Sequence, residues 1–471
     1  MYLLYHPDKG IAGQFRPTKQ REILVWDFRQ QCSEKLKRQI FDILSYLIET
    51  DISSVLRRDR LTALQKFYHF GIREQIGDIE QLEEIHIDRF QNYLSCQGTQ
   101  ALKRYMPIIN ICRKRLFITS EKIHWSANIW YLERFHIGQE RLNESSSLES
   151  ISFVEIKTKK HREIVQAYMQ YELGVTGQAI STITHRYRVI RNFLQYMEEN
   201  NLTILDCTAV HIEAYAKILQ ERKIEPKGYN ERLSGIGHFF QFMVVRNYIS
   251  KVNFRIEYYM QKVVTVHHDR SVEYEVYMEI LRKLYNFPEH LRCMFLHLWC
   301  LGLRVSEVCM LKGDAYYSQG KDCWIQVYQV KMKTYKRIPI PIGLYKIMLV
   351  YLRRHQIQPE DYIFKNKKGG AFLFQTFRCQ MLKACSENQI QNGEYIFKSH
   401  DYRHTVASMF YDGGVSIQSI RDYLGHINEE MTRQYINYMP QKIAQANEEY
   451  FSHSENSLAG CLEKGALDGE R

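Results

Sequence analysis

The chain has 471 residues, of which 45% are hydrophobic and 25% are charged. This composition fits a soluble globular protein of two to four domains with a sizeable core. No apolar run is long enough to span a bilayer and no secretory hydrophobic region follows Met1, so we expect a cytoplasmic protein without a membrane partner. The formal net charge of +11 favours a polyanionic partner.

Eleven cysteines, from Cys32 to Cys461, are scattered singly and form no CxxC pair. An odd number without metal-ligand spacing is typical of reduced thiols in a cytosolic or nuclear setting, so a structural zinc site is not expected. The chain also lacks the paired carboxylates that a metal-dependent nuclease would need. We therefore predict neither a metal nor a cofactor.

Residues 1–150 are predicted to form a helical N-terminal region. Residues 1–21 lack periodicity and are predicted to be an irregular lead-in. Between residues 22 and 118, apolar side chains recur at helical spacing. Residues 143–150 are polar and serine-rich, which predicts a linker.

A second helical block is predicted over residues 155–260. Its helices are expected near residues 164–172, 180–200, 210–222 and 228–246.

Parts of this block are similar to the N-terminal region. Residues 210–219 are similar in character to residues 85–94, and residues 190–193 to residues 64–67, at almost the same offset. Two interpretations stay open. Either the N-terminal region contains a diverged copy of the second block, or unrelated amphipathic helices share one apolar stripe.

Residues 399–438 combine residue types that suit an attack on a phosphodiester. His400 and Arg403 lie three apart, so they share a face if a helix begins here. Leu-Gly-His426 and then Tyr435 follow. A phenol has a pKa of about 10, so it needs a base to take its proton and cations to hold the phosphate. Arginine can hold two phosphate oxygens at once, and histidine transfers protons near pH 7.

A second arginine lies upstream, in the phrase Gly-Leu-Arg304-Val-Ser-Glu307. Glu307 is interpreted as a buried group that orients an arginine, because a free carboxylate would repel a phosphodiester. Residues 324–330 and 337–340 alternate like paired strands around a polar turn that offers a lysine.

Together these motifs resemble the tyrosine recombinase, or phage integrase, family, which includes transposon-encoded members. The resemblance covers residues 273–451. The family pattern is an arginine in a GLRxSE-like box, a lysine on a β-turn, His-x-x-Arg, a Leu-Gly-His box and a tyrosine nine residues after that histidine. In this sequence the matching residues are Arg304, Lys333, His400, Arg403, His426 and Tyr435. Lys333 is preferred to Lys331, which stays an alternative, because Pro341 follows Lys333 at the family's spacing.

The resemblance implies a role for each residue. Tyr435 would attack DNA to give a 3′-phosphotyrosine, and the two arginines would hold the non-bridging oxygens. His400 would accept the phenolic proton and His426 would brace the phosphate. Lys333 would donate a proton to the 5′-hydroxyl leaving group.

The resemblance also implies a mainly α fold with a small antiparallel β-sheet in the catalytic domain. Residues 155–260 resemble the family's helical, SAM-like core-binding domain, and residues 270–451 the catalytic domain. Within the latter, residues 440–451 are expected to form a helix that docks onto a neighbouring protomer. Residues 452–471 are predicted to be a disordered tail.

The partners implied are double-stranded DNA at specific recombination sites, further copies of the chain in a homotetramer, and accessory recombination proteins. A DNA-acting protein of this kind would be associated with the nucleoid. Candidate phosphate contacts are Arg186, Arg188, Arg232, Lys336 and Arg337. The alternative for any one of them is a solvated basic face.

The predicted function is that of a site-specific DNA recombinase, the integrase or transposase of a mobile element, which works without metal or ATP. Two alternatives belong to other classes. A type IB topoisomerase shares the chemistry but rejoins the same strand, and a DNA-binding protein that has lost catalysis would form no covalent adduct.

Overall fold

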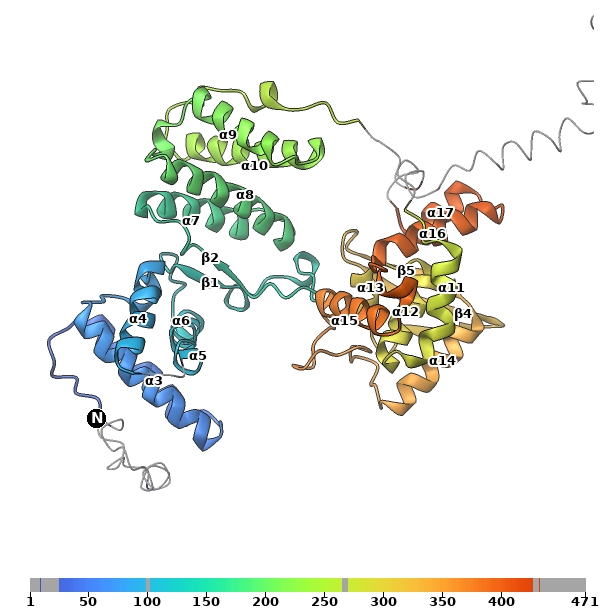
Figure 1. Ribbon diagram of the computed structural model, residues 1–471, viewed down its shortest axis with the longest axis horizontal. Helices are drawn as coiled ribbons and strands as arrows, with labels where there is room; N and C mark the ends of the chain where they lie inside the picture. The colour runs from blue at the N-terminus through green and yellow to red at the C-terminus, as the bar shows by residue number, and fades with distance from the viewer. Residues whose placement is uncertain (1–8, 10–24, 99–101, 265–269, 427–431, 433–471) are drawn as a thin grey trace, which may run out of the picture. The chain divides into compact units, whose positions relative to one another are not determined.

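The computed structural model describes residues 9, 25–98, 102–264, 270–426 and 432. These residues divide into two compact units, which are described separately (Figure 1). Unit 1 contains the described residues up to Val264 except Asn143–Ser147, and unit 2 contains Asn143–Ser147 and the described residues from 270 onward. No helix in these ranges combines the length and the apolar composition needed to cross a membrane.

Several sequence predictions fall outside the described residues. They are the lead-in over residues 1–21 (apart from residue 9), the helix over residues 440–451 and the tail over residues 452–471.

The first half of unit 1 is a group of helices around its own apolar core. Its elements are α2 (Glu34–Glu49), α3 (Ser54–Arg73), the 3-10 helix η3 (Ile79–Gln81), α4 (Glu84–Cys96), α5 (Leu102–Tyr105) and α6 (Ile108–Thr119). Helix α2 is amphipathic and buries Ile40 and Leu47. Ser53 caps α3, because its hydroxyl accepts a hydrogen bond from the Leu56 amide. Pro107, which has no amide hydrogen, lies between α5 and α6.

The second half of unit 1 has a separate core that extends from Phe117 to Ile256. Its helices are α7 (Lys159–Gly174), α8 (Ile180–Glu199), the 3-10 helix η6 (Ile204–Asp206), α9 (Ala209–Glu221), α10 (Pro226–Val245) and the 3-10 helix η7 (Ile256–Tyr259). The four predicted α-helices are therefore present. Helix α7 begins earlier than predicted because its basic first turn interrupts the apolar stripe. Arg162 in that turn is nevertheless buried and donates a hydrogen bond to the carbonyl of Ile156 at 2.6 Å.

Unit 1 also contains a hairpin that the sequence did not predict. Strands β1 (Ile129–Tyr131) and β2 (Ser150–Ser152) pair antiparallel, with Trp130 opposite Ile151. Three-residue strands are too short to show an alternating pattern. The hairpin is stabilised by aromatic packing, because the rings of Trp130 and Phe153 lie 4.7 Å apart edge to face.

Unit 2 is mainly helical and contains a three-stranded antiparallel sheet. Its α-helices are α11 (Tyr274–Lys283), α12 (Glu289–Leu301), α13 (Val305–Cys309), α14 (Ile342–Arg354), α15 (Phe374–Glu387), α16 (Ser399–Asp412) and α17 (Ile417–Leu424). Residues Asn143–Ser147, part of the predicted linker, belong to this unit, where the carbonyl of Ser145 accepts a hydrogen bond from the Phe374 amide. The predicted fold class, mainly α with a small antiparallel sheet, is confirmed.

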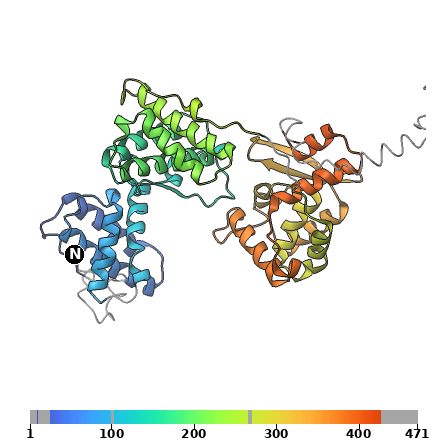
Figure 2. The ribbon, with the colours of Figure 1, turned by 45° about the horizontal axis from the view of Figure 1, so that its top comes forward.

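The sheet of unit 2 has the order β3 (Tyr316–Gln319), β4 (Asp322–Gln329) and β5 (Thr334–Ile340). The two predicted strands correspond to β4 and β5, whose register places Ile325 opposite Ile338. Strand β3 was not predicted. Buried and exposed side chains alternate along β4 and β5, so one face of the sheet is buried. Figure 2 shows the strands beside α16 and α17, which matches the hydrogen bond from Lys336 on β5 to the end of α17.

Candidate active site

Arg304 lies where one helix of unit 2 ends and the next begins. Helix α12 ends at Gly302, which takes a left-handed conformation with φ 60°. A Cβ at Gly302 would lie 3.2 Å from side-chain atoms of Leu424 and Val406, so glycine also permits close packing against α16 and α17. Arg304 then caps α13. Its backbone amide donates a hydrogen bond to Glu307 at 2.9 Å, and its guanidinium donates one to the same carboxylate at 2.8 Å.

Glu307 is the buried carboxylate at the centre of this site. Its side chain is 2% exposed. Burial alone would raise the pKa of Glu307, but the charges of Lys336, Arg403 and Arg304 hold it below its ordinary value. Glu307 therefore stays ionised at neutral pH. The predicted role as a buried orienter of an arginine fits this position.

Lys336 on β5 extends into the same site. Its ammonium lies 3.8 Å from Glu307 and donates hydrogen bonds of 3.3 Å to the carbonyls of Tyr423 and Leu424. Burial lowers the pKa of Lys336 to about 8, although Glu307 opposes this shift. The alternative of a solvated basic face does not match this buried position of Lys336, and its role as a phosphate contact stays a prediction. The neighbouring Arg337 is exposed and donates a hydrogen bond to Gln326 at 3.0 Å.

Arg403 joins two helix ends. Its side chain is 1% exposed on α16 and donates hydrogen bonds to the carbonyls of Gly302 at 2.8 Å and Leu424 at 2.6 Å. Carbonyls at the C-terminal end of a helix carry partial negative charge and have no partner within the helix. A guanidinium is therefore well suited to hold the ends of α12 and α17 together. Arg304 and Arg403, which are far apart in the sequence, are brought to one site in this way.

His400 occupies the first turn of α16, as the sequence predicted. The surrounding protein atoms lower the pKa of this exposed histidine to about 4, and the charges of His404, Arg403, Arg304 and Lys331 act in the same direction. The imidazole is therefore neutral at pH 7 and can accept a proton.

His426 follows the end of α17. Gly425 ends this helix in a left-handed conformation with φ 69°, and a Cβ there would collide with the side-chain amide of Gln329. His426 is buried, and its Nδ1 lies 3.0 Å from the hydroxyl of Thr432. Burial, together with the charges of Arg403 and the other cations of the site, lowers the pKa of His426 to about 3. The glycine thus determines where the histidine lies.

The turn between β4 and β5 carries both candidate lysines. Lys333 is exposed and has a left-handed backbone with φ 54°. Lys331 is also exposed, and its charge is among those that lower the pKa of His400. The structure does not separate the two lysines, so the preference for Lys333 stays a prediction. Lys336 was predicted as a phosphate contact and not as a member of this site, although it lies on the same buried face of β5 as Ile338 and Ile340.

Tyr435, the predicted nucleophile, lies outside the described residues. Among the residues that the structure describes, no three His, Cys, Asp or Glu side chains gather in a way that could hold a metal ion.

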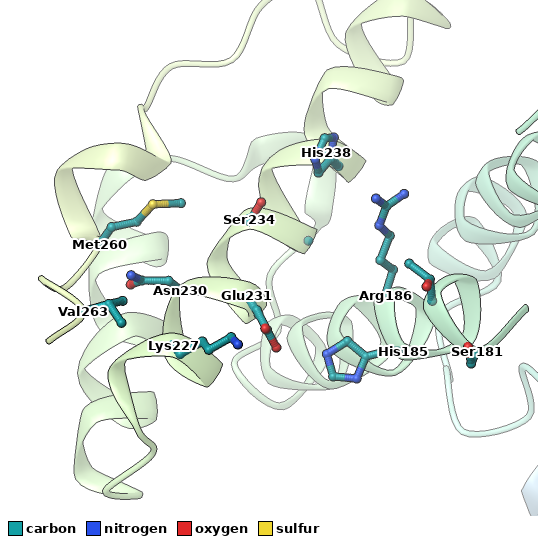
Figure 3. Close-up of a pocket in the computed structure, with 12 residues that line it drawn as sticks. Ser181, His185, Arg186, Lys227, Asn230, Glu231, Ser234, His238, Met260 and Val263 are labelled. Carbon is teal, nitrogen blue, oxygen red and sulfur yellow. The ribbon is translucent and has the colours of Figure 1, made fainter. Parts of the chain in front are cut away.

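Unit 1 has a groove of about 670 Å³ between α8 and α10. Figure 3 shows His185 and Arg186 on one side and Lys227, Glu231 and His238 on the other. Of these, only Arg186 is a predicted DNA contact, and the sequence analysis missed Lys227 as a candidate.

The predicted arginines of unit 1 differ in their surroundings. Arg186 lies 3.3 Å from the buried carboxylate of Glu172. Arg232 donates a hydrogen bond to the carbonyl of Gly228 at 2.7 Å and does not line the groove. Arg188 is exposed on α8 outside the groove lining.

Comparison with known proteins agrees with the geometry of unit 2. Residues 270–442 match the model of the phage integrase family. Transposase B of transposon Tn554 from Staphylococcus aureus strain Mu50 is 26% identical over 322 residues, which cover 66% of this chain and 51% of the transposase. A tyrosine recombinase from Pseudothermotoga lettingae is 25% identical over 287 residues, which cover 59% of this chain and 95% of the recombinase. A crystal structure of the XerH site-specific recombinase bound to palindromic difH substrate has a TM-score of 0.49 at 13% identity, covering 63% of this chain and 91% of that one.

Unit 2 is thus mainly helical with a small antiparallel sheet, and it gathers Arg304, Lys336 and Arg403 around the buried carboxylate of Glu307. Residues 270–442 match the phage integrase family, and the chain is similar to the Tn554 transposases and to Xer tyrosine recombinases. The chain spans only about half the length of the transposases it matches.

Proposed function

We propose that the protein is a site-specific DNA recombinase of a mobile element, which cleaves and rejoins DNA through a 3′-phosphotyrosine. The observation that carries this proposal is the convergence of Arg304 at the start of α13, His400 and Arg403 on α16, and His426 after α17. The match of residues 270–442 to the phage integrase family supports it, because that segment includes Tyr435.

The proposed cleavage is an in-line exchange of one phosphodiester for another. The Tyr435 oxygen forms a bond to phosphorus as the bond from phosphorus to the 5′ oxygen breaks. His400, neutral at pH 7, accepts the phenolic proton, and a lysine of the β4–β5 turn donates a proton to the departing 5′ oxygen. The lysine is Lys331 or Lys333.

The two arginines stabilise the charge that develops on the phosphate. Their guanidinium groups are oriented before substrate arrives, Arg304 by Glu307 and Arg403 by two helix-end carbonyls. Donors that need no reorganisation during the reaction are usually the largest contribution to catalysis. His426 braces the same phosphate. Because the tyrosine ester conserves the bond energy, a 5′-hydroxyl from another strand can reverse the attack without ATP.

The remaining parts of the proposal concern assembly. Residues 155–260 would act as the core-binding domain, with Arg186, Arg188 and Arg232 contacting DNA phosphates and Arg337 contributing from the catalytic domain. The groove between α8 and α10 adds Lys227 to this set. Strand exchange between two sites would require a homotetramer on double-stranded DNA, together with any accessory recombination proteins that the element encodes.

Covalent trapping tests the proposal. The wild-type chain and the Tyr435→Phe variant are incubated in chelator with a nicked duplex that carries the terminal sequence of the encoding element. A denaturing gel should show a protein–DNA adduct with the wild type and none with the variant. Tyr438→Phe, three residues further on, is the matched control and should retain the adduct.

The other outcomes identify the alternatives. An adduct that survives in Tyr435→Phe and disappears in Tyr438→Phe would move the nucleophile. Intact DNA binding without any adduct would favour a DNA-binding protein that has lost catalysis. Relaxation of a supercoiled plasmid without paired sites would favour the topoisomerase.

A further inference from the structure

The first four elements of the two halves of unit 1 occur in the same order and with the same lengths, whereas the single helix α10 of the second half stands where the first half has α5 and α6. Helices α2 and α7 each have 16 residues, and α3 and α8 each have 20. A 3-10 helix of three residues follows in both halves, as η3 and η6. Helices α4 and α9 then have 13 residues each.

The turns that connect these elements also agree. Gln75 after α3 and Asn201 after α8 both take a left-handed backbone, with φ 52° and 56°. The residue that follows donates a backbone hydrogen bond to the last turn of its helix in both halves, Ile76 to Gly71 at 2.9 Å and Leu202 to Met197 at 2.8 Å. The same turn also follows α10 at Asn247 and α14 at Gln356, so it supports the correspondence only together with the equal helix lengths.

The starts of the third helices share an unusual cap. The backbone amide of Glu83 donates a hydrogen bond to Nδ1 of His86 at 3.2 Å, and that of Thr208 donates one to Nδ1 of His211 at 3.1 Å. Glutamate or glutamine is the common partner at this position of a capping box. The apolar stripe that amphipathic helices share therefore does not account for a histidine at this position in both helices.

The apolar faces of the long helices correspond at six positions after the first two turns, although Ile180, Ile183 and Thr184 near the start of α8 have no buried counterpart in α3. Relative to the start of each helix, buried positions in α3 coincide with buried positions in α8. The corresponding pairs are Leu61 and Tyr187, Ala63 and Val189, Leu64 and Ile190, Phe67 and Phe193, Tyr68 and Leu194, and Gly71 and Met197. Length, turns, caps and core thus repeat together, which favours duplication over unrelated helices.

We propose that residues 34–119 are a second copy of the module formed by residues 159–245, and that this copy binds duplex DNA through α3 and α5. The proposal rests on the proposed function, in which the module at residues 159–245 contacts DNA. Arg186 in the second turn of α8 and Lys227, the second residue of α10, line the groove of that module. Arg60 occupies the corresponding place in α3, and Lys103 is the second residue of α5.

The charges around Arg60 and Lys103 suit a phosphate backbone. Arg58, Lys103 and Arg104 are exposed. Arg104 lies 3.6 Å from Asp59, which places α5 beside the first half of α3. Cations on two adjacent helices are the arrangement that neutralises neighbouring phosphates.

Salt-dependent binding tests the inference. The full-length chain is titrated onto a fluorescein-labelled duplex of random sequence, and its affinity is measured over about 50 to 200 mM salt. Three double variants are compared with wild type: Arg60→Gln with Lys103→Gln in the first copy, Arg186→Gln with Lys227→Gln in the second, and Arg29→Gln with Arg38→Gln as the control. Arg29 and Arg38 are exposed; Arg29 precedes α2 and Arg38 lies in its first half, so neither belongs to α3 or α5.

We expect the first-copy and second-copy variants each to reduce the slope of log affinity against log salt by about 2 and the affinity by on the order of tenfold. The control pair should change neither. An unchanged slope in the first-copy variant, with a reduced slope in the second-copy variant, would overturn this inference alone and leave the first copy to a protein partner. An equal loss in the control pair would also overturn it, because net charge would then explain the effect. A wild-type chain without salt-dependent DNA affinity would overturn both this inference and the proposed function.

Discussion

Replacing Lys336 by methionine is expected to stabilise unit 2 while reducing adduct formation. The methionine keeps an apolar stem of similar length but removes the buried ammonium. Adduct formation should fall because Lys336 holds the carbonyl of Leu424 at the end of α17, close to His426. Stability and activity would thus change in opposite directions, as is common at active sites.

The expected gain in stability of Lys336→Met follows from the cost of burying the charged ammonium of Lys336. Burial lowers the pKa of Lys336 from 10.5 to about 8, and this difference corresponds to a cost of about 3 kcal/mol for keeping the amine protonated at neutral pH. The two hydrogen bonds to the carbonyls of Tyr423 and Leu424 contribute about 1 kcal/mol each and are lost with the amine. Lys336→Met should therefore be more stable than wild type by about 1 kcal/mol at pH 7.

The pH dependence of the free energy of unfolding provides a second test of this prediction. Between pH 8 and 10.5 the unfolded chain still holds the proton that the native Lys336 has lost. The unfolded state then binds more protons, so the stability of wild type should rise with pH over this interval. Lys336→Met should lack this rise.

Hydrogen exchange of the amides in β4 and β5 is the appropriate assay, because a chain with two compact units need not unfold in one step. Arg337→Met is the matched control. It changes the next residue of the same strand, which is exposed, and should alter the free energy of opening by less than about 0.5 kcal/mol. A loss of more than about 1 kcal/mol in Lys336→Met at pH 7 would refute the reasoning, since it would mean that the ion pair with Glu307 outweighs the burial penalty.

Two further predictions concern the histidines of the site. Gly425→Ala forces a side chain into a left-handed backbone with φ 69° and against Gln329. The free energy of opening at the end of α17, measured by hydrogen exchange, should therefore fall by about 2 to 3 kcal/mol. Adduct formation should fall at least about tenfold. Gly320→Ala has a similar φ of 63° but open space around it, and should lose only about 1 kcal/mol without changing adduct formation. The rate of adduct formation should stay constant as the pH falls from neutral and should decline only as it approaches the pKa of His400 at about 4. A decline centred near 6.5, measured with pre-bound DNA, would show that His400 has an ordinary pKa.

Local sequence patterns were sufficient to predict much of the fold. Helices α8, α9 and α10 follow from apolar residues at helical spacing, and β4 and β5 follow from alternation around a polar turn. These patterns succeed because each depends on neighbouring residues. The β1–β2 hairpin was missed because strands of three residues leave no periodic signal and are stabilised by the packing of Trp130 and Phe153.

The repetition within unit 1 was visible in the sequence only as a weak similarity. Residues 85–94 and 210–219 share an apolar stripe, which amphipathic helices often share by chance. Equal helix lengths, paired left-handed residues and paired histidine caps became visible only once the backbone was known. These features depend on turn conformation, which side-chain periodicity does not record.

The sequence by itself determined which residue types the site contains, because few other functions require arginine, histidine and tyrosine at these spacings. Only the tertiary structure decided that Lys336 points inward to Glu307 and that Arg403 joins the ends of α12 and α17. The physical reason is that the partners of these contacts are a buried carboxylate and backbone carbonyls. Their positions depend on how the helices pack, and the spacing of residues along the chain does not encode that packing.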